Sequence, residues 1–254
     1  MTCEHTKACL EATLAQAGRY SERGRWTGIE GKRTYITGPD DAEYGVLYIY
    51  DIFSFRPQSL QGADILAFSA SKPTLVVMVD WFNGIAVKDE WMTSDAGRNL
   101  MRQFVKTTAD PGTILPAVIG VLHKLKTDMY YPRVKKWGAV GFCWGGKLVS
   151  LLATQGEESL ITVAAQSSPA RLEPEEAKTV TIPMAVLASS KEVGEAVKLY
   201  EENLKGAKHV EVFGSQVHGW MSASYGRGDL EDPKVRSEYE RGYRTLVDFF
   251  DKHF

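Results

Sequence analysis

Gly-Phe-Cys-Trp-Gly-Gly, residues 141–146, lies between an apolar run (137–142) that predicts a buried strand and a segment (144–154) that predicts a helix. A strand, a one-residue turn and a helix, with a glycine on each side of the turn, form a nucleophile elbow. The tight turn strains the backbone of Cys143 and exposes its side chain, and the flanking glycines allow close packing. The helix N-terminus favours a thiolate at this position. The alternative is a structural cysteine buried at a close strand–helix contact.

Short apolar runs alternate with helical patterns along the rest of the chain. Strands are predicted over 34–37, 46–51, 74–80, 137–142, 161–166, 182–189 and 209–213, and helices over 58–69, 113–126, 144–154, 194–204 and 233–253. Because such strands pair in parallel through right-handed crossovers, we predict an α/β fold, a mostly parallel central sheet with helices on both faces. The irregular stretch 80–110 is interpreted as a lid over the site, with an ordinary surface crossover as the alternative.

The composition indicates one large domain without specialised segments. The chain has 254 residues, with 30 basic and 32 acidic side chains and a formal net charge of −2. No linker, repeat or low-complexity run divides it, so we predict a single domain over 1–254 in which residues 1–30 form a loosely attached N-terminal segment. The near-neutral charge gives no reason to expect a nucleic-acid or membrane partner.

The predicted location is cytoplasmic, and a monomer or homodimer is expected. No apolar run approaches the ~20 residues that span a bilayer, and the polar N-terminus does not resemble a secretory signal.

Cys3, His5 and Cys9 lie close together in the sequence, but a metal site needs a fourth ligand that no second cluster offers. We therefore expect no metal and no cofactor.

A thiol nucleophile needs a base, and elbow enzymes keep the chain order nucleophile, acid, histidine. His218 lies in Gln216-Val-His-Gly-Trp220, just past the last predicted strand, where the base of such an enzyme belongs. His209 begins that strand and is the less suitable candidate. The alternative for His218 is a structural loop histidine.

The acid should follow the predicted strand 182–189. The loop there reads Ser-Lys-Glu-Val-Gly-Glu, residues 190–195, so Glu192 is the candidate and Glu195 the reserve. Aspartate is the usual acid, and glutamate is one methylene longer. Both glutamates are alternatively solvated residues at the start of a helix.

Two backbone amides are candidates for an oxyanion hole. Asp51 ends the strand 46–51, and the amide of Ile52 is placed to act together with that of Trp144. Paired donors of this kind stabilise the negative charge that develops on a reacting carbonyl oxygen. The alternative for Asp51 is a turn or cap residue.

Three segments resemble the dienelactone hydrolase family, and most closely its fungal branch. They are Gly-Phe-Cys-Trp-Gly-Gly, the stretch Tyr-Asp-Ile-Phe-x-Phe-x-Pro-Gln-x-Leu-Gln-Gly-Ala-Asp-Ile-Leu-Ala at 50–67, and Val-His-Gly-Trp at 217–220. The resemblance extends from about residue 34 to the last residue. It implies an α/β-hydrolase fold and cleavage of lactones or small esters through an acyl-enzyme thioester.

The resemblance also implies roles for individual residues. The positions that match the family's nucleophile, base and acid are Cys143, His218 and Glu192, where Glu192 replaces an aspartate. Asp51 matches an acid that contacts the resting thiol in the family, and Ile52 and Trp144 match its oxyanion-hole amides.

This chain departs from the family pattern at several positions. Ser54 stands where glycine is usual, and Asn83 falls near a position that often carries an arginine for a substrate carboxylate. Arg56, Lys88 and Arg98 are possible substitutes for that arginine. The residues expected to line the substrate pocket are Trp81, Asn83 and Trp220.

The residues and the resemblance support three hypotheses. The first is a cysteine-dependent hydrolase of a small lactone or carboxylic ester. This small-molecule substrate is the partner that we expect. The second is a tailoring enzyme of fungal secondary metabolism that acts on a lactone or polyketide without net hydrolysis. The third is a non-catalytic binding module. Product mass distinguishes the first two, because hydrolysis adds water.

Overall fold

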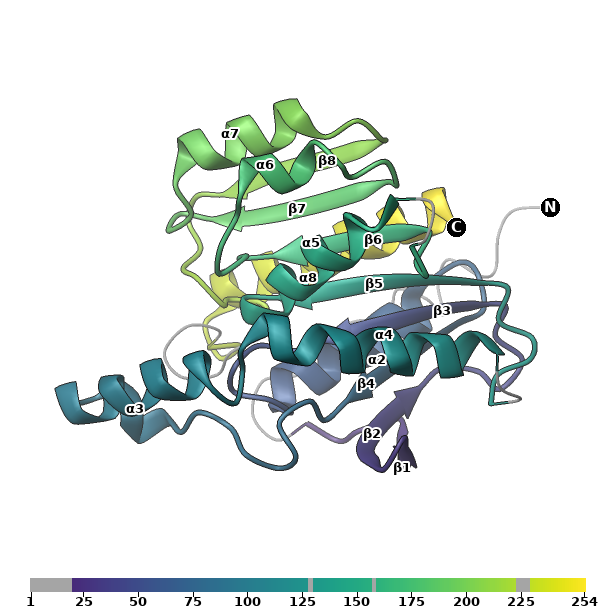
Figure 1. Ribbon diagram of the computed structural model, residues 1–254, viewed down its shortest axis with the longest axis horizontal. Coiled ribbons are helices and arrows are strands. Elements are labelled where there is room, and N and C mark those ends of the chain that lie inside the picture. The colour runs from purple at the N-terminus through teal and green to yellow at the C-terminus, as the bar shows by residue number, and fades with distance from the viewer. Residues whose placement is uncertain (1–19, 128–129, 157–158, 223–228) are drawn as a thin grey trace.

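The computed structural model describes residues 20–127, 130–156, 159–222 and 229–254. A central sheet of eight strands has the order β1-β2-β4-β3-β5-β6-β7-β8 (Figure 1). The strands are β1 Arg25–Ile29, β2 Lys32–Thr37, β3 Tyr44–Ile49, β4 Thr74–Val79, β5 Lys136–Phe142, β6 Val163–Ser167, β7 Met184–Ser189 and β8 Lys208–Phe213. The helices are α2 Pro57–Ser69, α3 Asp95–Lys106, α4 Pro111–Thr127, α5 Trp144–Ala153, α6 Pro174–Ala177, α7 Gly194–Asn203 and α8 Pro233–His253, with a 3₁₀ helix η1 Asp89–Met92.

The sheet is mostly parallel, as the alternation of strands and helices predicts. β3 to β8 pair in parallel, and β1 and β2 join antiparallel beside β4. All seven predicted strands are present, with bounds that differ by at most two residues. β1 was not predicted, because this edge strand is largely exposed and lacks an apolar run.

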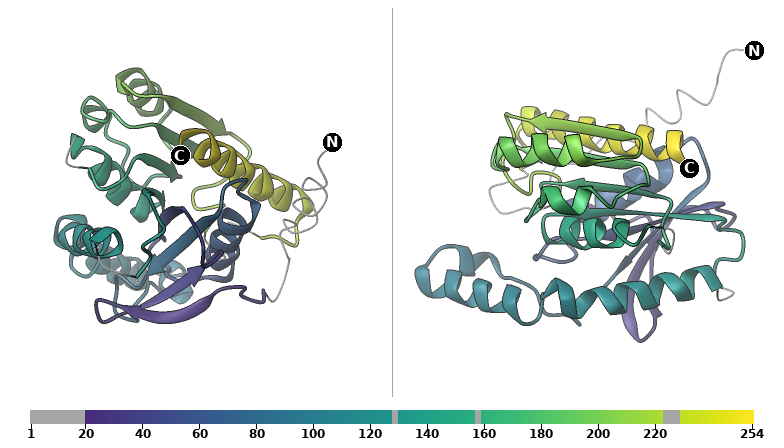
Figure 2. Two further views of the ribbon diagram at one scale, coloured as in Figure 1. Left: turned by 90° about the vertical axis from the view of Figure 1, so that its right-hand side faces the viewer. Right: turned by 45° about the horizontal axis from the view of Figure 1, so that its top comes forward.

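Helices cover both faces of the sheet (Figure 2). α2 and α8 pack on one face, and α4, α5, α6 and α7 lie on the other. Every residue of β4 and β7 is buried, which explains their continuous apolar sequence.

The predicted start of α8 is confirmed, since the Asp232 side chain accepts a hydrogen bond from the Lys234 amide at 2.8 Å and Pro233 follows it.

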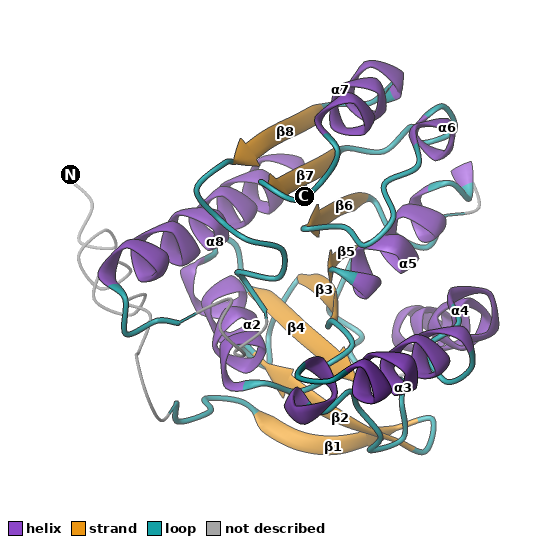
Figure 3. Ribbon diagram, turned by 90° about the vertical axis from the view of Figure 1, so that its left-hand side faces the viewer, coloured by secondary structure: helices purple, strands orange, loops and turns teal. Residues whose placement is uncertain are grey.

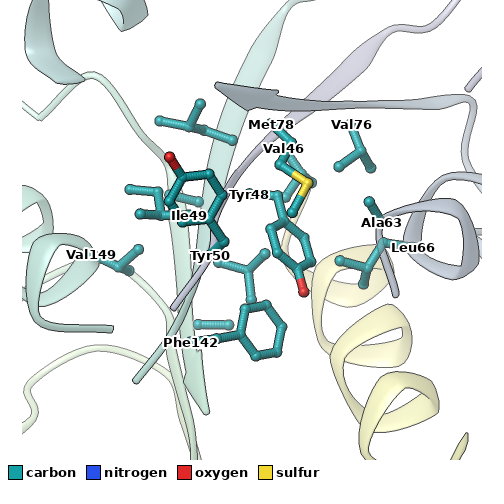
Figure 4. Close-up of a cluster of buried hydrophobic side chains, with 14 of the residues drawn as sticks. Val46, Tyr48, Ile49, Tyr50, Ala63, Leu66, Val76, Met78, Phe142 and Val149 are labelled. Carbon is teal, nitrogen blue, oxygen red and sulfur yellow. The ribbon is translucent and has the colours of Figure 1, made fainter. Parts of the chain in front are cut away.

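The core between the sheet and the α2–α8 layer is rich in aromatic residues. Tyr48 of β3 stacks on Phe142 at a ring-centroid distance of 4.6 Å, and its hydroxyl lies 2.9 Å from that of Tyr243 on α8. Figure 4 shows the Tyr48 hydroxyl pointing toward α8, with Ala63 and Leu66 of α2 beside the ring. Because Phe142 immediately precedes Cys143, this packing fixes the end of the strand that carries the elbow.

The first described residues correct the expectation of a loose segment through residue 30. β1 pairs with β2 along its whole length. The buried carboxylate of Asp64 on α2 accepts hydrogen bonds from the Tyr20 hydroxyl, from the Arg23 amide at 3.0 Å and from the Tyr35 hydroxyl at 2.8 Å. Residues 20–30 are therefore attached to the sheet and to α2 by hydrogen bonds that sequence patterns do not reveal.

The predictions for Cys3, His5 and Cys9 lie outside the described residues. Within the described ranges, no group of three or more His, Cys, Asp or Glu side chains is placed to hold a metal ion. No helix of the described part of the chain combines the length and the apolar character that a membrane span needs.

The stretch 80–110 holds η1 and α3, and α3 projects from the body at the edge where the parallel strands end (Figure 1). Figure 3 shows this side of the molecule facing the viewer. Ser94 caps α3 by accepting a hydrogen bond from the Gly97 amide at 3.1 Å. Only Gly97 and Phe104 of this helix are buried. Its few apolar residues recur at helical spacing, but the polar and charged residues between them make the pattern weak.

Candidate active site

Cys143 occupies the turn between β5 and α5 in a left-handed conformation, with φ 51° and ψ −110°. A Cβ on Gly141 would lie 2.1 Å from the carbonyl oxygen of Gly145, and one on Gly145 would lie 2.1 Å from that of Ile49. Glycine is therefore required on both sides of the cysteine because backbone atoms approach too closely for any side chain.

The neighbouring strand holds the backbone of the elbow. The Cys143 amide donates to the Ser167 carbonyl at 3.0 Å, and the Cys143 carbonyl accepts from the Ala170 amide at 3.0 Å. The last residue of β6 and the turn after it thus bind both polar backbone groups of this strained residue. No sequence motif marks Ser167 or Ala170 for this role.

His218 lies in the loop after β8 and contacts Glu192 in the loop after β7. Its Nδ1 is 2.8 Å from a carboxylate oxygen of Glu192, whose other oxygen accepts a hydrogen bond from the Ser189 amide. Glu195 is exposed at the start of α7. His209 lies near the start of β8, 3.4 Å from Glu211, at the opposite end of the strand from this loop.

The charges of this chain of residues are coupled. Burial lowers the pKa of His218, but the Cys143 thiolate and the Glu192 carboxylate outweigh this effect and raise the pKa to about 10. Burial likewise raises the pKa of Glu192, and its hydrogen bonds with His218 and Ser189 outweigh burial and lower it. The arrangement therefore favours the imidazolium form of His218, which lies between Cys143 and Glu192.

The candidate oxyanion amides lie on two rigid backbone segments. Trp144 is the first residue of α5, where helical amides lack partners within the helix, and its indole donates to the Ala109 carbonyl at 2.6 Å. The Ile52 carbonyl accepts from the Val87 amide at 3.0 Å, which fixes the orientation of this residue. Ser54 has a left-handed φ of 63°, which explains the preference for glycine at this position.

Asp51 is buried beside these amides, with 1% of its surface exposed. Its carboxylate accepts hydrogen bonds from the Phe53 amide at 2.8 Å and from the Ser222 hydroxyl at 2.6 Å. Burial raises its pKa, and these two hydrogen bonds oppose that effect. The described residues show no hydrogen bond between the Cys143 thiol and the Asp51 carboxylate, which differs from the contact that the resemblance implies.

The residues expected to line the pocket need correction. Trp220 is fully buried, with its ring 4.6 Å from that of Phe213, and Trp81 is buried in the core. Aromatic residues beside a site motif are as suitable for a core as for a pocket, and in this structure Trp81 and Trp220 both belong to the hydrophobic core. Asn83 is exposed on a turn with a φ of 53°, where it accepts a hydrogen bond from Lys32 at 3.2 Å.

A cavity of about 360 Å³ adjoins His218 and Glu192. It lies between the turn after β6 and the start of α7, and its apolar wall includes Leu172, Val193 and Ala196. A second, open cavity of about 520 Å³ borders the turn at residues 51–54, here called the oxyanion turn because it presents the candidate amide of Ile52. The residues that line this cavity include Arg56 and Lys88. No sequence pattern indicates the first cavity, because loop residues carry no periodic pattern.

The three cations considered as substitutes for a substrate-binding arginine differ in their surroundings. Arg56 forms an ion pair with Asp89 at 2.7 Å, and Arg98 pairs with Asp95 at 2.6 Å on exposed α3. Lys88 is exposed and lies 3.8 Å from Glu90. Each of these cations thus has a carboxylate nearby.

Comparison with known proteins places these features in context. The model of the dienelactone hydrolase family matches residues 33–254. An uncharacterized AIM2 family protein of Schizosaccharomyces pombe is 27% identical, over 89% of this chain and 90% of that protein. The hydrolase tropI of Talaromyces stipitatus is 26% identical, over 98% of this chain and 96% of that protein. The crystal structure of a dienelactone hydrolase from Anabaena variabilis has the same fold, with a TM-score of 0.66 and 14% identity over 92% of this chain and 98% of that one.

Proposed function

Since this chain belongs to the dienelactone hydrolase family and is a hydrolase of ester or lactone bonds, we propose that it cleaves a small lactone or carboxylic ester through a thioester on Cys143. The observation that carries the proposal is the alignment of Cys143, His218 and Glu192 at the ends of β5, β8 and β7. Nucleophile, base and orienting acid follow in the chain order of elbow enzymes. The proposed reaction needs no cofactor.

In the acylation step, the Cys143 thiolate attacks the carbonyl carbon of the substrate. The carbonyl oxygen becomes an oxyanion, to which the amides of Ile52 and Trp144 donate. The tetrahedral intermediate collapses, the carbon–oxygen bond to the leaving group breaks, and the His218 imidazolium protonates the departing alkoxide. In a lactone, that alkoxide stays attached to the acyl group.

In the deacylation step, neutral His218 accepts a proton from a water molecule that attacks the thioester carbon. Collapse releases the carboxylic acid, and the thiolate–imidazolium pair forms again. Glu192 holds the imidazole through Nδ1 and stabilises its charge in both steps. Because Glu192 also accepts the Ser189 amide hydrogen bond, the longer side chain is fixed to the strand end.

A second candidate is a tailoring enzyme that opens or closes a lactone, or rearranges a polyketide, without net hydrolysis. It is favoured by Asn83, an exposed asparagine that stands near the position where the family often carries an arginine for a substrate carboxylate. Such an enzyme uses the same thioester but transfers the acyl group to a hydroxyl of the substrate instead of water. For both candidates the proposed partner is a small-molecule substrate, and the proposed location of the protein is the cytoplasm.

The test is an intact-mass time course with a panel of activated esters and lactones. Wild type should form an acyl adduct and release products that have gained water. Cys143→Ala should form no adduct, and His218→Ala should turn over at least ~10²-fold more slowly. His209→Ala is the matched control and should behave as wild type. Products of unchanged mass would favour the tailoring enzyme, whereas tight binding without adduct or turnover would favour a non-catalytic module.

A further inference from the structure

A buried polar cluster joins three segments that are distant in the sequence. It consists of Asp51 at the end of β3, Ser59 in the first turn of α2, and Ser222 in the loop that carries His218. Each is at most 1% exposed. The segments 51–59 and 218–222 are separated by more than 150 residues of chain, so the cluster is a tertiary contact between the oxyanion turn and the histidine loop.

Each oxygen atom of the Asp51 carboxylate binds a different one of these segments. One accepts from the Phe53 amide at 2.8 Å and so closes the turn that presents the Ile52 amide. The other accepts from the Ser222 hydroxyl at 2.6 Å. The Asp51 side chain is thus the direct link between the oxyanion turn and the loop of the base.

Ser222 is in turn fixed to the residue next to the base. Its amide donates to the Gly219 carbonyl at 3.1 Å, and Gly219 directly follows His218. The Ser222 carbonyl accepts from the Ser59 hydroxyl at 3.0 Å, which anchors the same loop on α2. Any displacement of Ser222 therefore moves the backbone that carries the imidazole.

The burial of this carboxylate has a free-energy cost that a core residue of similar volume would avoid. Among the described residues no ion pair reaches Asp51. Its two hydrogen bonds oppose the effect of burial, and so do the more distant charges of His218 and Arg56. A buried polar group of this kind fixes geometry, because its partners must lie at hydrogen-bond distance in one arrangement. Catalysis needs such fixation, since the oxyanion donors and the base must face one substrate carbon from separate loops.

We propose that Asp51 and Ser222 are positioning residues that hold the oxyanion turn in register with the His218 loop. The inference rests on the proposed function, because it assigns the geometry of that same site. It also replaces the contact with the resting thiol that the resemblance implies. Asp51 acts here through its two hydrogen bonds and not through its charge on the sulfur.

Ser222→Ala removes the link but leaves the Asp51–Phe53 and His218–Glu192 contacts in place. We expect kcat for an activated ester to fall about tenfold or more, with KM changed by less than about threefold, because the lost hydrogen bond is to a carboxylate and misalignment acts on the transition state. Alkylation of Cys143 by iodoacetamide needs the thiolate but no oxyanion hole, and its rate should stay within about twofold of wild type.

Ser150→Ala is the matched control. Ser150 lies within α5, away from the elbow, and is also 1% exposed. Its hydroxyl donates to the carboxylate of Glu176 at 2.8 Å. This variant should lose a comparable amount of stability and keep kcat within about twofold. Asp51→Asn keeps an acceptor for the Phe53 amide and gains a donor for Ser222, so it should retain most of kcat. Asp51→Ala loses both hydrogen bonds and should be at least as slow as Ser222→Ala. The double variant Asp51→Ala/Ser222→Ala should be no slower than Asp51→Ala alone.

Three results would overturn the inference. Ser222→Ala could be as active as Ser150→Ala, Asp51→Asn could be as slow as Asp51→Ala, or alkylation of Ser222→Ala could slow in parallel with its ester turnover. The latter two outcomes would indicate a role of the Asp51 charge at the thiol. If Ser222→Ala does not fold, the comparison of Asp51→Asn with wild type decides alone. A wild type without adduct or turnover would refute the proposed function instead.

Discussion

Replacement of Gly141 by alanine tests whether the close approach of β5 and α5 sets the position of Cys143. The new Cβ would lie 2.1 Å from the Gly145 carbonyl oxygen and 2.6 Å from the Gly146 nitrogen, well inside the 3.4 Å at which ordinary van der Waals contact begins. Since both atoms belong to the backbone, no rotamer change relieves the overlap, and strand and helix must separate by roughly 1 Å. A displacement of that size at a nucleophile can reduce the rate about 100-fold.

We therefore expect Gly141→Ala to lower kcat/KM for an activated ester about 100-fold and the free energy of unfolding by about 3 kcal/mol, the upper end for overpacked sites. The measurements are initial rates and urea unfolding. Gly120→Ala is the control, because Gly120 is exposed within α4 and a Cβ there has no neighbour within 4 Å. It should gain about 0.5–1 kcal/mol without a change in rate. The reasoning is refuted if Gly141→Ala matches Gly120→Ala in both measurements.

Further substitutions test the acid, the charge pair and the N-terminal attachment. Glu192→Gln should lower kcat about tenfold or more, whereas exposed Glu195→Gln should not; the reverse order would transfer the role to Glu195. The raised pKa of His218 stabilises the fold fully below about pH 6.5, and this contribution is lost as pH rises through about 10. Cys143→Ala removes the main cause of that raised pKa, so its unfolding free energy should fall at lower pH than in wild type; identical pH profiles from urea unfolding would contradict this. Asp64→Ala leaves the buried Tyr35 hydroxyl and its neighbours without an acceptor and should cost about 3 kcal/mol in urea unfolding, with kcat unchanged.

The sequence predicts the sheet and its helices well, because strong periodic patterns determine them. β3, β4 and the start of α8 lie within two residues of their predicted positions. The contact between His218 and Glu192 also joins two residues that the chain order of elbow enzymes identifies. Their catalytic roles remain predictions until activity is measured.

What the sequence did not predict depends on tertiary contacts between loops. The function of Ser222 follows only from its distance to Asp51, 171 residues away in the chain. The motif at 217–220 predicts that Trp220 lines the pocket, but its side chain is buried. The direction of a side chain after a turn is not encoded in a periodic pattern. The same limit applies to the cavity wall at Leu172 and Val193.

The order of the strands leaves β1 and β8 at the two edges of the sheet, and an open edge can pair with another chain. β8 exposes Val212, at 55%, and this residue alone would favour edge-to-edge aggregation. The charged residues around it oppose such pairing. Lys208 is exposed, and Glu211 forms an ion pair with Arg241 of α8 across the edge. We therefore expect these charges to oppose edge-to-edge pairing at high protein concentration, and a substitution that neutralises Glu211 should increase aggregation without changing the geometry of the active site.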